Sequence, residues 1–166
     1  MGEVTWPLEQ NMIRGQKVSN TFGMVRTYAN GTPKPHQGWD FAAAVGTPAY
    51  AIADGKIEFI ADSGDYGKQI CMSFAWKDQQ TLYAFYAHMN AIMVSKDQQV
   101  TINTMIGTFG KSGNDQNLPA SKDNLNFEIR TQAYTGLGLS KRLSPIKVFG
   151  KCPLYAIVDG NEIISF

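Results

Sequence analysis

The segment His36-Gln37-Gly38-Trp39-Asp40 places a histidine and an aspartate four positions apart around a glycine. If the glycine permits a sharp bend, an imidazole nitrogen and a carboxylate oxygen can turn toward one point. Both are ligands that zinc accepts. Two ligands alone do not make a metal site, so a turn that enters a strand, with His36 at the surface, explains these five residues equally well.

Two further stretches carry side chains of the same chemical type. His88, the second of the two histidines in the sequence, closes an aromatic-rich segment of the kind that forms half-buried strands. In the segment that follows Asp123, a strand would turn Asn124 and Asn126 to one face and Leu125 and Phe127 to the other. This pattern predicts a strand with one buried face and one face toward a groove.

Short strand-like runs separated by turn residues surround these segments, at a spacing of about ten residues. No long run has the 3.6-residue period of an amphipathic helix. An Asp-Gly pair between apolar runs favours a hairpin. The pattern predicts an all-β sandwich or barrel in a single domain over residues 1–166, with hairpins or turns at Asp54-Gly55, Gly64 to Gly67 and Asp159-Gly160. Residues 150–166 are expected to form a C-terminal extension, as a hairpin.

Composition excludes several classes of function. The 166 residues are 43% hydrophobic and 17% charged, with a formal net charge of +1. These values are typical of a folded domain and give no electrostatic reason to expect nucleic acid or an acidic membrane as a partner. No apolar run is long enough to span a bilayer, and the first residues lack the basic and apolar regions of a signal peptide. We therefore expect a cytosolic protein, export by another route, or an excised domain.

The two cysteines, Cys71 and Cys152, are far apart in the sequence and belong to no Cys-x-x-Cys motif. Thiolate metal binding is therefore not expected. One disulfide or two free thiols both remain compatible with the sequence, and two free thiols are favoured.

Taken in order, these motifs resemble the lysostaphin-type, or LytM-like, zinc endopeptidases of bacterial cell walls. His36, Gly38 and Asp40 match the H-x-G-x-D segment of that family, and Tyr86-Ala87-His88 matches its Y-A-H segment. Asn124 to Glu128 takes the place of its HLHFE-type strand. Weaker matches, which extend the resemblance over residues 18–131, are Phe22 to Arg26, Gly46-Thr47-Pro48 with Asp54-Gly55, and Ile106 to Gly110. The resemblance implies an antiparallel LytM-like sheet sandwich, a duplicated hybrid motif similar to a barrel-sandwich.

The resemblance also implies roles for individual residues. His36 and Asp40 match two zinc ligands, and His88 matches one catalytic histidine. Asn126 stands at the third zinc ligand and Asn124 at the other catalytic histidine. Asparagine oxygen is a harder and less basic ligand than imidazole, and suits calcium, magnesium or manganese better than zinc. An amide also cannot transfer a proton at neutral pH.

These departures predict that zinc is bound weakly or not at all, and that the peptidase is impaired. Substitution of a group that only supports a metal ligand already costs about 10–100-fold in affinity or activity. The most favoured function is a degenerate member, a pseudoenzyme of the bacterial envelope that binds peptidoglycan peptides or a partner protein. Trp39, Tyr66 and Tyr86 are candidate substrate-binding aromatics, although each is individually more typical of a core residue.

Three alternatives remain open at this stage. The first is an active zinc endopeptidase that cleaves peptide cross-links of peptidoglycan; a weaker form of it holds metal loosely at His36, Asp40 and Asn126, with His88 as the sole acid–base group and much reduced activity. The two asparagines are deliberate, inactivating replacements. A biotinyl or lipoyl carrier domain shares the glycine-rich strand pattern, but Lys56 lacks the flanking residues of a modified lysine.

Overall fold

The computed structural model describes residues 2–113, 124–158 and 161–164, and for Asn124 and residues 155–164 it describes the backbone alone. Within these residues the fold is mainly antiparallel β-sheet with short helical turns, as the sequence predicts. None of the helices in the described part of the chain is long and apolar enough to cross a membrane.

Nine strands form the main sheet within the described residues. Its path runs β11-β10-β7-β6-β5-β8, while β3 pairs with β10, and β9 pairs with both β4 and β7. The strands are β3 (Trp39–Ala42), β4 (Pro48–Tyr50), β5 (Gly55–Ser63), β6 (Gly67–Ala75), β7 (Thr81–Ile92), β8 (Gln99–Val100), β9 (Met105–Phe109), β10 (Asn124–Arg130) and β11 (Arg142–Leu143).

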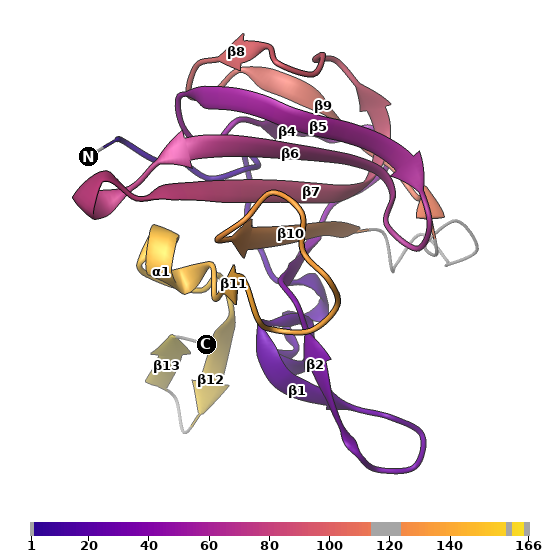
Figure 1. Cartoon of the computed structure of the whole chain (residues 1–166). Helices are drawn as coiled ribbons and strands as arrows, with labels where there is room; N and C mark the ends of the chain where they lie inside the picture. Colours follow the sequence, from indigo (N-terminus) through magenta and orange to yellow (C-terminus); the bar gives the residue numbers. More distant parts are fainter. Residues whose placement is uncertain (1, 114–123, 159–160, 165–166) are drawn as a thin grey trace.

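Two hairpins stand apart from this sheet. β1 (Gly23–Thr27) pairs with β2 (Pro33–His36), and β12 (Tyr155–Val158) pairs with β13 (Asn161–Ile164). The helical elements are short: η1 (Arg14–Gln16), η2 (Val18–Asn20), η3 (Lys77–Gln79) and α1 (Ile146–Phe149). In Figure 1 the long strands β5, β6 and β7 lie side by side with β10 next to β7, and the β1–β2 hairpin projects from the body.

The main sheet has two apolar faces because the side chains of β7 and β10 alternate. Tyr86 and Phe127 belong to the larger core, whereas Phe85 belongs to a smaller cluster with Phe59, Cys71 and Ala87. Trp6, Trp39 and Phe149 stack at one end of the larger core, with Trp6 and Phe149 centroids 4.4 Å apart. This stack ties the N-terminal segment and α1 to the strand that carries Asp40.

Of the turns predicted from the sequence, one is confirmed and one is wrong. Gly64 to Gly67 connects β5 and β6 as a hairpin, as predicted. Asp54-Gly55 does not join two paired strands: β4 pairs with β9, and β5 pairs with β6 and β8. The Asp54 carboxylate instead accepts a hydrogen bond from the backbone N–H of Ile102. That hairpin prediction is wrong because long-range pairing overrides the local turn signal. The Asp159-Gly160 turn lies outside the described residues.

Candidate functional site

Gly38 lies between β2 and β3 and determines how closely β10 approaches them. A Cβ built on Gly38 would overlap the carbonyl oxygen of Phe127 and the side chain of Glu128. Gly38 does not have the positive φ that favours glycine. The chain does bend at Gly38, as the sequence suggested, but glycine is required here by the close approach of two backbones and not by a positive φ.

His36 and Asp40 come together on either side of Gly38, as predicted. His36 Nε2 lies 3.2 Å from Asp40 Oδ1, and both side chains are buried. The other ring nitrogen, Nδ1, lies 2.7 Å from the backbone oxygen of Thr21. Because a carbonyl oxygen only accepts, the Thr21 contact requires a proton on Nδ1 and leaves Nε2 facing the carboxylate.

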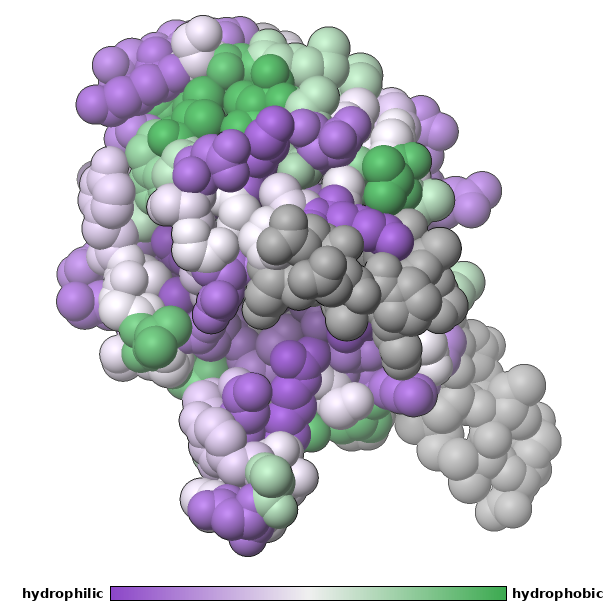
Figure 2. Space-filling view, turned by 90° about the vertical axis from the view of Figure 1, so that its right-hand side faces the viewer, coloured by the Kyte–Doolittle hydropathy of each residue, from purple (hydrophilic) through white to green (hydrophobic). Residues whose placement is uncertain are grey.

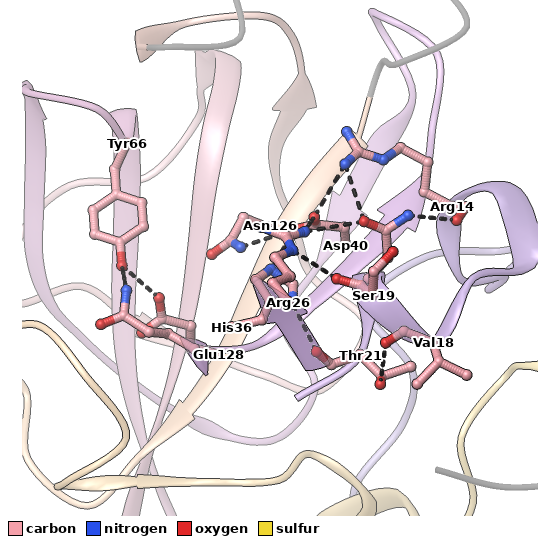
Figure 3. Close-up of polar contacts among 12 residues, drawn as sticks. Arg14, Val18, Ser19, Thr21, Arg26, His36, Asp40, Tyr66, Asn126 and Glu128 are labelled. Atoms are coloured by element: carbon pink, nitrogen blue, oxygen red, sulfur yellow. Dashed lines mark hydrogen bonds and ion pairs between the residues drawn. The ribbon is translucent and has the colours of Figure 1, made fainter. Parts of the chain in front are cut away.

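Two arginines hold the second oxygen of Asp40. Arg26 from β1 and Arg14 from η1 place Nη2 atoms 2.7 and 3.3 Å from Asp40 Oδ2. Both guanidinium groups also donate to Asn20 Oδ1, at 3.0 and 3.1 Å. Figure 3 shows Asp40 between these groups on one side and Asn126 on the other. The arrangement binds the N-terminal segment and the projecting hairpin to the site.

The pKa of Asp40 is set by opposing effects. Burial alone would raise it, but the charge and hydrogen bond of His36 and the charges of Arg26 and Arg14 lower it further than burial raises it. The net result is a pKa well below the ordinary value of a carboxyl group. Asp40 is therefore an ionised carboxylate across the physiological pH range.

Asn126 faces the same carboxylate from β10, where its Cα is paired with that of Asp40. Its Nδ2 donates to Asp40 Oδ1 at 2.9 Å. The orientation of the amide is fixed chemically, because a carboxylate cannot donate to an amide oxygen. Asn126 Oδ1 is consequently turned away from Asp40, and it is buried with no hydrogen-bond partner among the described residues.

These contacts test how well the residues suit zinc. His36 Nε2 and Asp40 Oδ1 are two suitable donors at a separation that one metal ion can bridge. The third position offers an amide N–H to Asp40, and Oδ2 is already held by arginines. Within the described ranges no group of three His, Cys, Asp or Glu residues is arranged to hold a metal. The donor set is thus one short of the three protein ligands of a catalytic zinc.

His88 reaches this face of the sheet through a β-bulge. Between the pairs Lys68–Met89 and Ile70–Tyr86, two residues of β7 oppose one residue of β6. Tyr86 and Met89 both belong to the larger core, so Ala87 and His88 share the opposite face. His88 has a φ of 60° and its Nδ1 lies 2.8 Å from the backbone oxygen of Ser112. Bulges re-aim side chains in this way, and the bulge turns His88 to the face that carries Asn126.

A second polar cluster follows Asn126 on the same face of β10. Glu128 is fully buried, and its Oε1 accepts hydrogen bonds from Arg130 Nε at 2.9 Å and Arg142 Nε at 2.7 Å. Tyr66 donates to Glu128 Oε2 at 2.8 Å and accepts from Gln37 at 2.7 Å. Burial, followed by the charge of Glu128, raises the pKa of Tyr66. The cluster links the turn that carries Tyr66 to the segment of the H-x-G-x-D motif.

The aromatic candidates separate into two groups. Tyr66 lines a surface cavity and contributes to the polar network. Trp39 and Tyr86 are 0% exposed and lie in the larger core, where the Tyr86 hydroxyl donates to Tyr50 O. Neither therefore offers surface to a ligand, which corrects the prediction for both. Because Trp39 precedes Asp40 in a strand, it points to the opposite side from that carboxylate.

Asn124 pairs with Ala42 through its backbone, and its side chain lies outside the described residues.

Sequence reasoning did not identify Arg14 and Arg26 as part of the site. Arg26 lies in a matched motif, but no local spacing shows that its guanidinium reaches Asp40. Only the fold of the β1–β2 hairpin makes this contact.

Comparison with known proteins agrees with the fold and the motifs. Residues 34–136 match the sequence model of Peptidase family M23. Peptidoglycan DD-endopeptidase ShyA of Vibrio cholerae is 32% identical over 79 residues, which cover 48% of this chain and 17% of that protein. DD-carboxypeptidase/endopeptidase Mpg of Neisseria meningitidis is 34% identical over 97 residues, covering 58% of this chain and 21% of that protein.

The catalytic domain of the antimicrobial peptidase lysostaphin from Staphylococcus simulans has a similar fold. The TM-score is 0.61 at 24% identity, with 78% of this chain and 89% of that domain covered. The first curated relatives are much longer proteins, of which the chain spans between 17 and 22%.

Proposed function

This chain belongs to peptidase family M23, and we propose that it binds peptidoglycan peptides, or a partner protein, on a peptidase frame with an impaired metal centre. Its place of action in this proposal is the bacterial cell envelope. Relatives named as peptidoglycan endopeptidases support the substrate class. The family association with zinc makes zinc the metal to test.

The observation that carries this proposal is the orientation of Asn126. Its N–H group is directed at Asp40 Oδ1, where an imidazole ligand would leave room for a cation. Arg26 and Arg14 supply positive charge to Asp40 Oδ2, so the carboxylate is neutralised by the protein itself. A cation that entered between His36 and Asp40 would have to displace the Asn126 hydrogen bond and would gain only an amide oxygen.

Proton transfer is the second deficiency. His88 is the single histidine available for acid–base chemistry on this face once His36 is engaged with Asp40. An asparagine at position 124 can donate a hydrogen bond to an oxyanion but cannot give up or take a proton near neutrality. A positioned acid–base group contributes about 10²–10⁴-fold to a rate, so loss of one group alone makes cleavage slow.

The alternative is an active, or deliberately inactivated, zinc endopeptidase that cuts peptide cross-links. Family membership and the retained His36, Asp40 and His88 support it. It requires that Asn126 rotate its oxygen into the site when metal is present. Metal content separates this alternative from the main proposal.

Zinc is measured by elemental analysis of untagged protein, because a histidine tag would itself bind metal. We expect far less than one zinc per chain in the protein as it stands, and about one in the N124H/N126H variant. An N30H/N90H variant carries the same two substitutions on exposed residues and should remain metal-free. Stoichiometric zinc in the unaltered protein would contradict the impaired metal centre and favour the active endopeptidase.

Binding and cleavage are measured on the same preparations. Sedimentation with insoluble peptidoglycan should deplete the protein from solution, without release of new peptide amino groups. The N124H/N126H variant should release them if its zinc supports catalysis. Failure of the unaltered chain to sediment with peptidoglycan would exclude direct wall binding and leave a partner protein as the ligand.

A further inference from the structure

A surface cavity of about 440 Å³ adjoins the Glu128 cluster. It lies on the same face of β10 as the site of His36, Asp40 and Asn126, further along the strand. It is formed by the end of β5, the turn of Tyr66, the end of β10 and the loop that follows β10. Among the described residues, its charged lining residues are Arg130 and Arg142 alone, and both are nine-tenths or more buried. Two guanidinium groups face one carboxylate, Glu128, so the cavity wall carries a net charge of about +1.

The two arginines have donors to spare. Arg130 uses Nε on Glu128 and Nη1 on the backbone oxygen of Ala133. Arg142 uses Nε on Glu128 and Nη1 on the backbone oxygens of Gly136 and Gly138. The Nη2 group of each has no hydrogen-bond partner among the residues that the structure describes. A fixed guanidinium with a free N–H edge is suited to an oxyanion.

Thr135 provides an independent sign of a missing ligand. Thr135 is one of the cavity's lining residues, and its Oγ1 atom is buried with no hydrogen-bond partner in the described part of the chain. Buried hydroxyl groups are normally hydrogen-bonded, so an orphan on a cavity wall calls for an explanation. A ligand oxygen bound at this wall is the explanation that the Thr135→Val variant tests.

The remaining walls are mixed, with polar Ser63 and Gln69 beside apolar side chains of β5 and of the loop after β10. Phe59 stacks on Tyr134 with a centroid separation of 4.8 Å. Tyr134 is 70% exposed and Leu137 is 88% exposed, on either side of Thr135 in the loop. Because Arg142 binds two carbonyl oxygens of this loop, the rim is held in place before any ligand arrives, which reduces the entropy lost on binding.

We propose that this cavity binds an organic monocarboxylate with a small apolar group beside it, such as the free carboxyl end of a short peptide. The single net positive charge and the apolar rim fit this class better than a multiply charged, fully polar anion. That the natural ligand is a wall peptide rests on the proposed function; the carboxylate chemistry of the cavity does not.

The test is an NMR titration of isotopically labelled full chain with N-acetyl-alanyl-alanine, which has a free carboxylate, and with its C-terminal amide. The carboxylate should shift the Nε–Hε signals of Arg130 and Arg142 and the amide signals of residues 134–138. The amide analogue should shift them at least tenfold more weakly. Equal binding of both compounds, or shifts confined to other parts of the chain, would overturn the proposal.

Inorganic phosphate is the second probe. If it shifts the same signals at lower concentration than the peptide carboxylate, the cavity is a general oxyanion site and the proposed ligand class is wrong. The Thr135→Val variant keeps the shape and removes the orphan hydroxyl, so it should fold normally and weaken the peptide carboxylate about tenfold, since hydrogen bonds to charged groups are strong. Thr131→Val, outside the cavity lining, is the matched control and should not change binding.

The two proposals can fail separately. Peptidoglycan sedimentation without carboxylate-dependent shifts refutes the cavity assignment and leaves the wall-binding function standing. Carboxylate-dependent shifts without sedimentation support the cavity and refute wall binding.

Discussion

Two carboxylates on neighbouring strands, Asp40 on β3 and Glu128 on β10, are each held by two arginines. The pairs differ in burial. At Asp40 the arginine side chains are 18 and 29% exposed, whereas at Glu128 they are 5 and 1% exposed. The ion pairs of Asp40 are therefore partly solvated, whereas those of Glu128 belong to a buried network.

The two clusters also differ in which hydrogen-bonding groups lack a partner among the described residues. Near Asp40 the orphan is an acceptor, Asn126 Oδ1. Near Glu128 the unused groups are donors, on the Nη2 atoms of Arg130 and Arg142. Asn126, Glu128 and Arg130 lie on one face of β10 because they are two positions apart in a strand, so the two clusters are neighbours along that strand. Figure 2 shows that hydrophilic residues predominate around the base of the projecting hairpin on the face it displays.

The largest effect is expected from neutralising Glu128. Glu128→Gln leaves two buried guanidinium groups without a counter-charge, and breaking a buried pair in this way costs about 3–5 kcal/mol. The free energy of unfolding in urea measures the loss. Glu58→Gln is the matched control, because its ion pair with Lys56 is more exposed, at 25 and 40%, and should cost about 0–1 kcal/mol. Similar losses in the two variants would contradict the contrast in burial.

A smaller loss is expected at Asp40. Asp40→Asn should cost about 1–3 kcal/mol at pH 7, because the freed arginines can turn toward solvent. The pKa of Asp40 is lowered on folding, so its contribution is fully present above the ordinary carboxyl pKa and is lost as pH falls toward the lowered value. The difference between wild type and variant should shrink below about pH 4. Chelator-treated protein is used throughout, and a difference that grows on acidification would contradict the assignment.

The fold class predicted from the sequence is confirmed. The structure brings His36, Asp40 and Asn126 together, while their roles at a metal stay a prediction. Neither Cys71 nor Cys152 forms a disulfide in the described part of the chain, which confirms the favoured alternative. Glu128 and Arg130, two positions apart on β10, form a buried ion pair.

Features that depend on long-range register could not be predicted. The bulge that turns His88 to the site results from β7 being paired with β6, and alternation alone would place His88 on the core side. The arginine contacts to Asp40 depend on where the β1–β2 hairpin folds back. Trp39 and Tyr86 lie close in sequence to site residues, but strand geometry directs them into the core.

Tyr66 joins the Glu128 cluster to the H-x-G-x-D segment, and its hydroxyl should have a modest effect. Tyr66→Phe removes a donor to Glu128 and an acceptor for Gln37, which should cost about 1–2 kcal/mol of unfolding free energy. Tyr134→Phe is the control, since that side chain is 70% exposed and should change stability by less than about 0.5 kcal/mol. If Tyr66→Phe is as neutral as the control, the hydroxyl does not connect the two regions.

The smallest expected effect is on the reactivity of the Cys71 thiol, which reports how often the sheet opens locally near Glu128. Cys71 is fully buried beside this cluster, and burial raises the pKa of its thiol to about 12. At pH 8 the thiolate fraction of such a group is only about one in ten thousand, so in a Cys152→Ala background Cys71 should not react with a disulfide reagent while the protein is folded. Adding Glu128→Gln should accelerate the reaction in proportion to the population of open states, whereas adding Asp40→Asn should leave it nearly unchanged. Equal acceleration by both substitutions would mean that the two carboxylate clusters open as one unit and that their difference in burial does not separate them energetically.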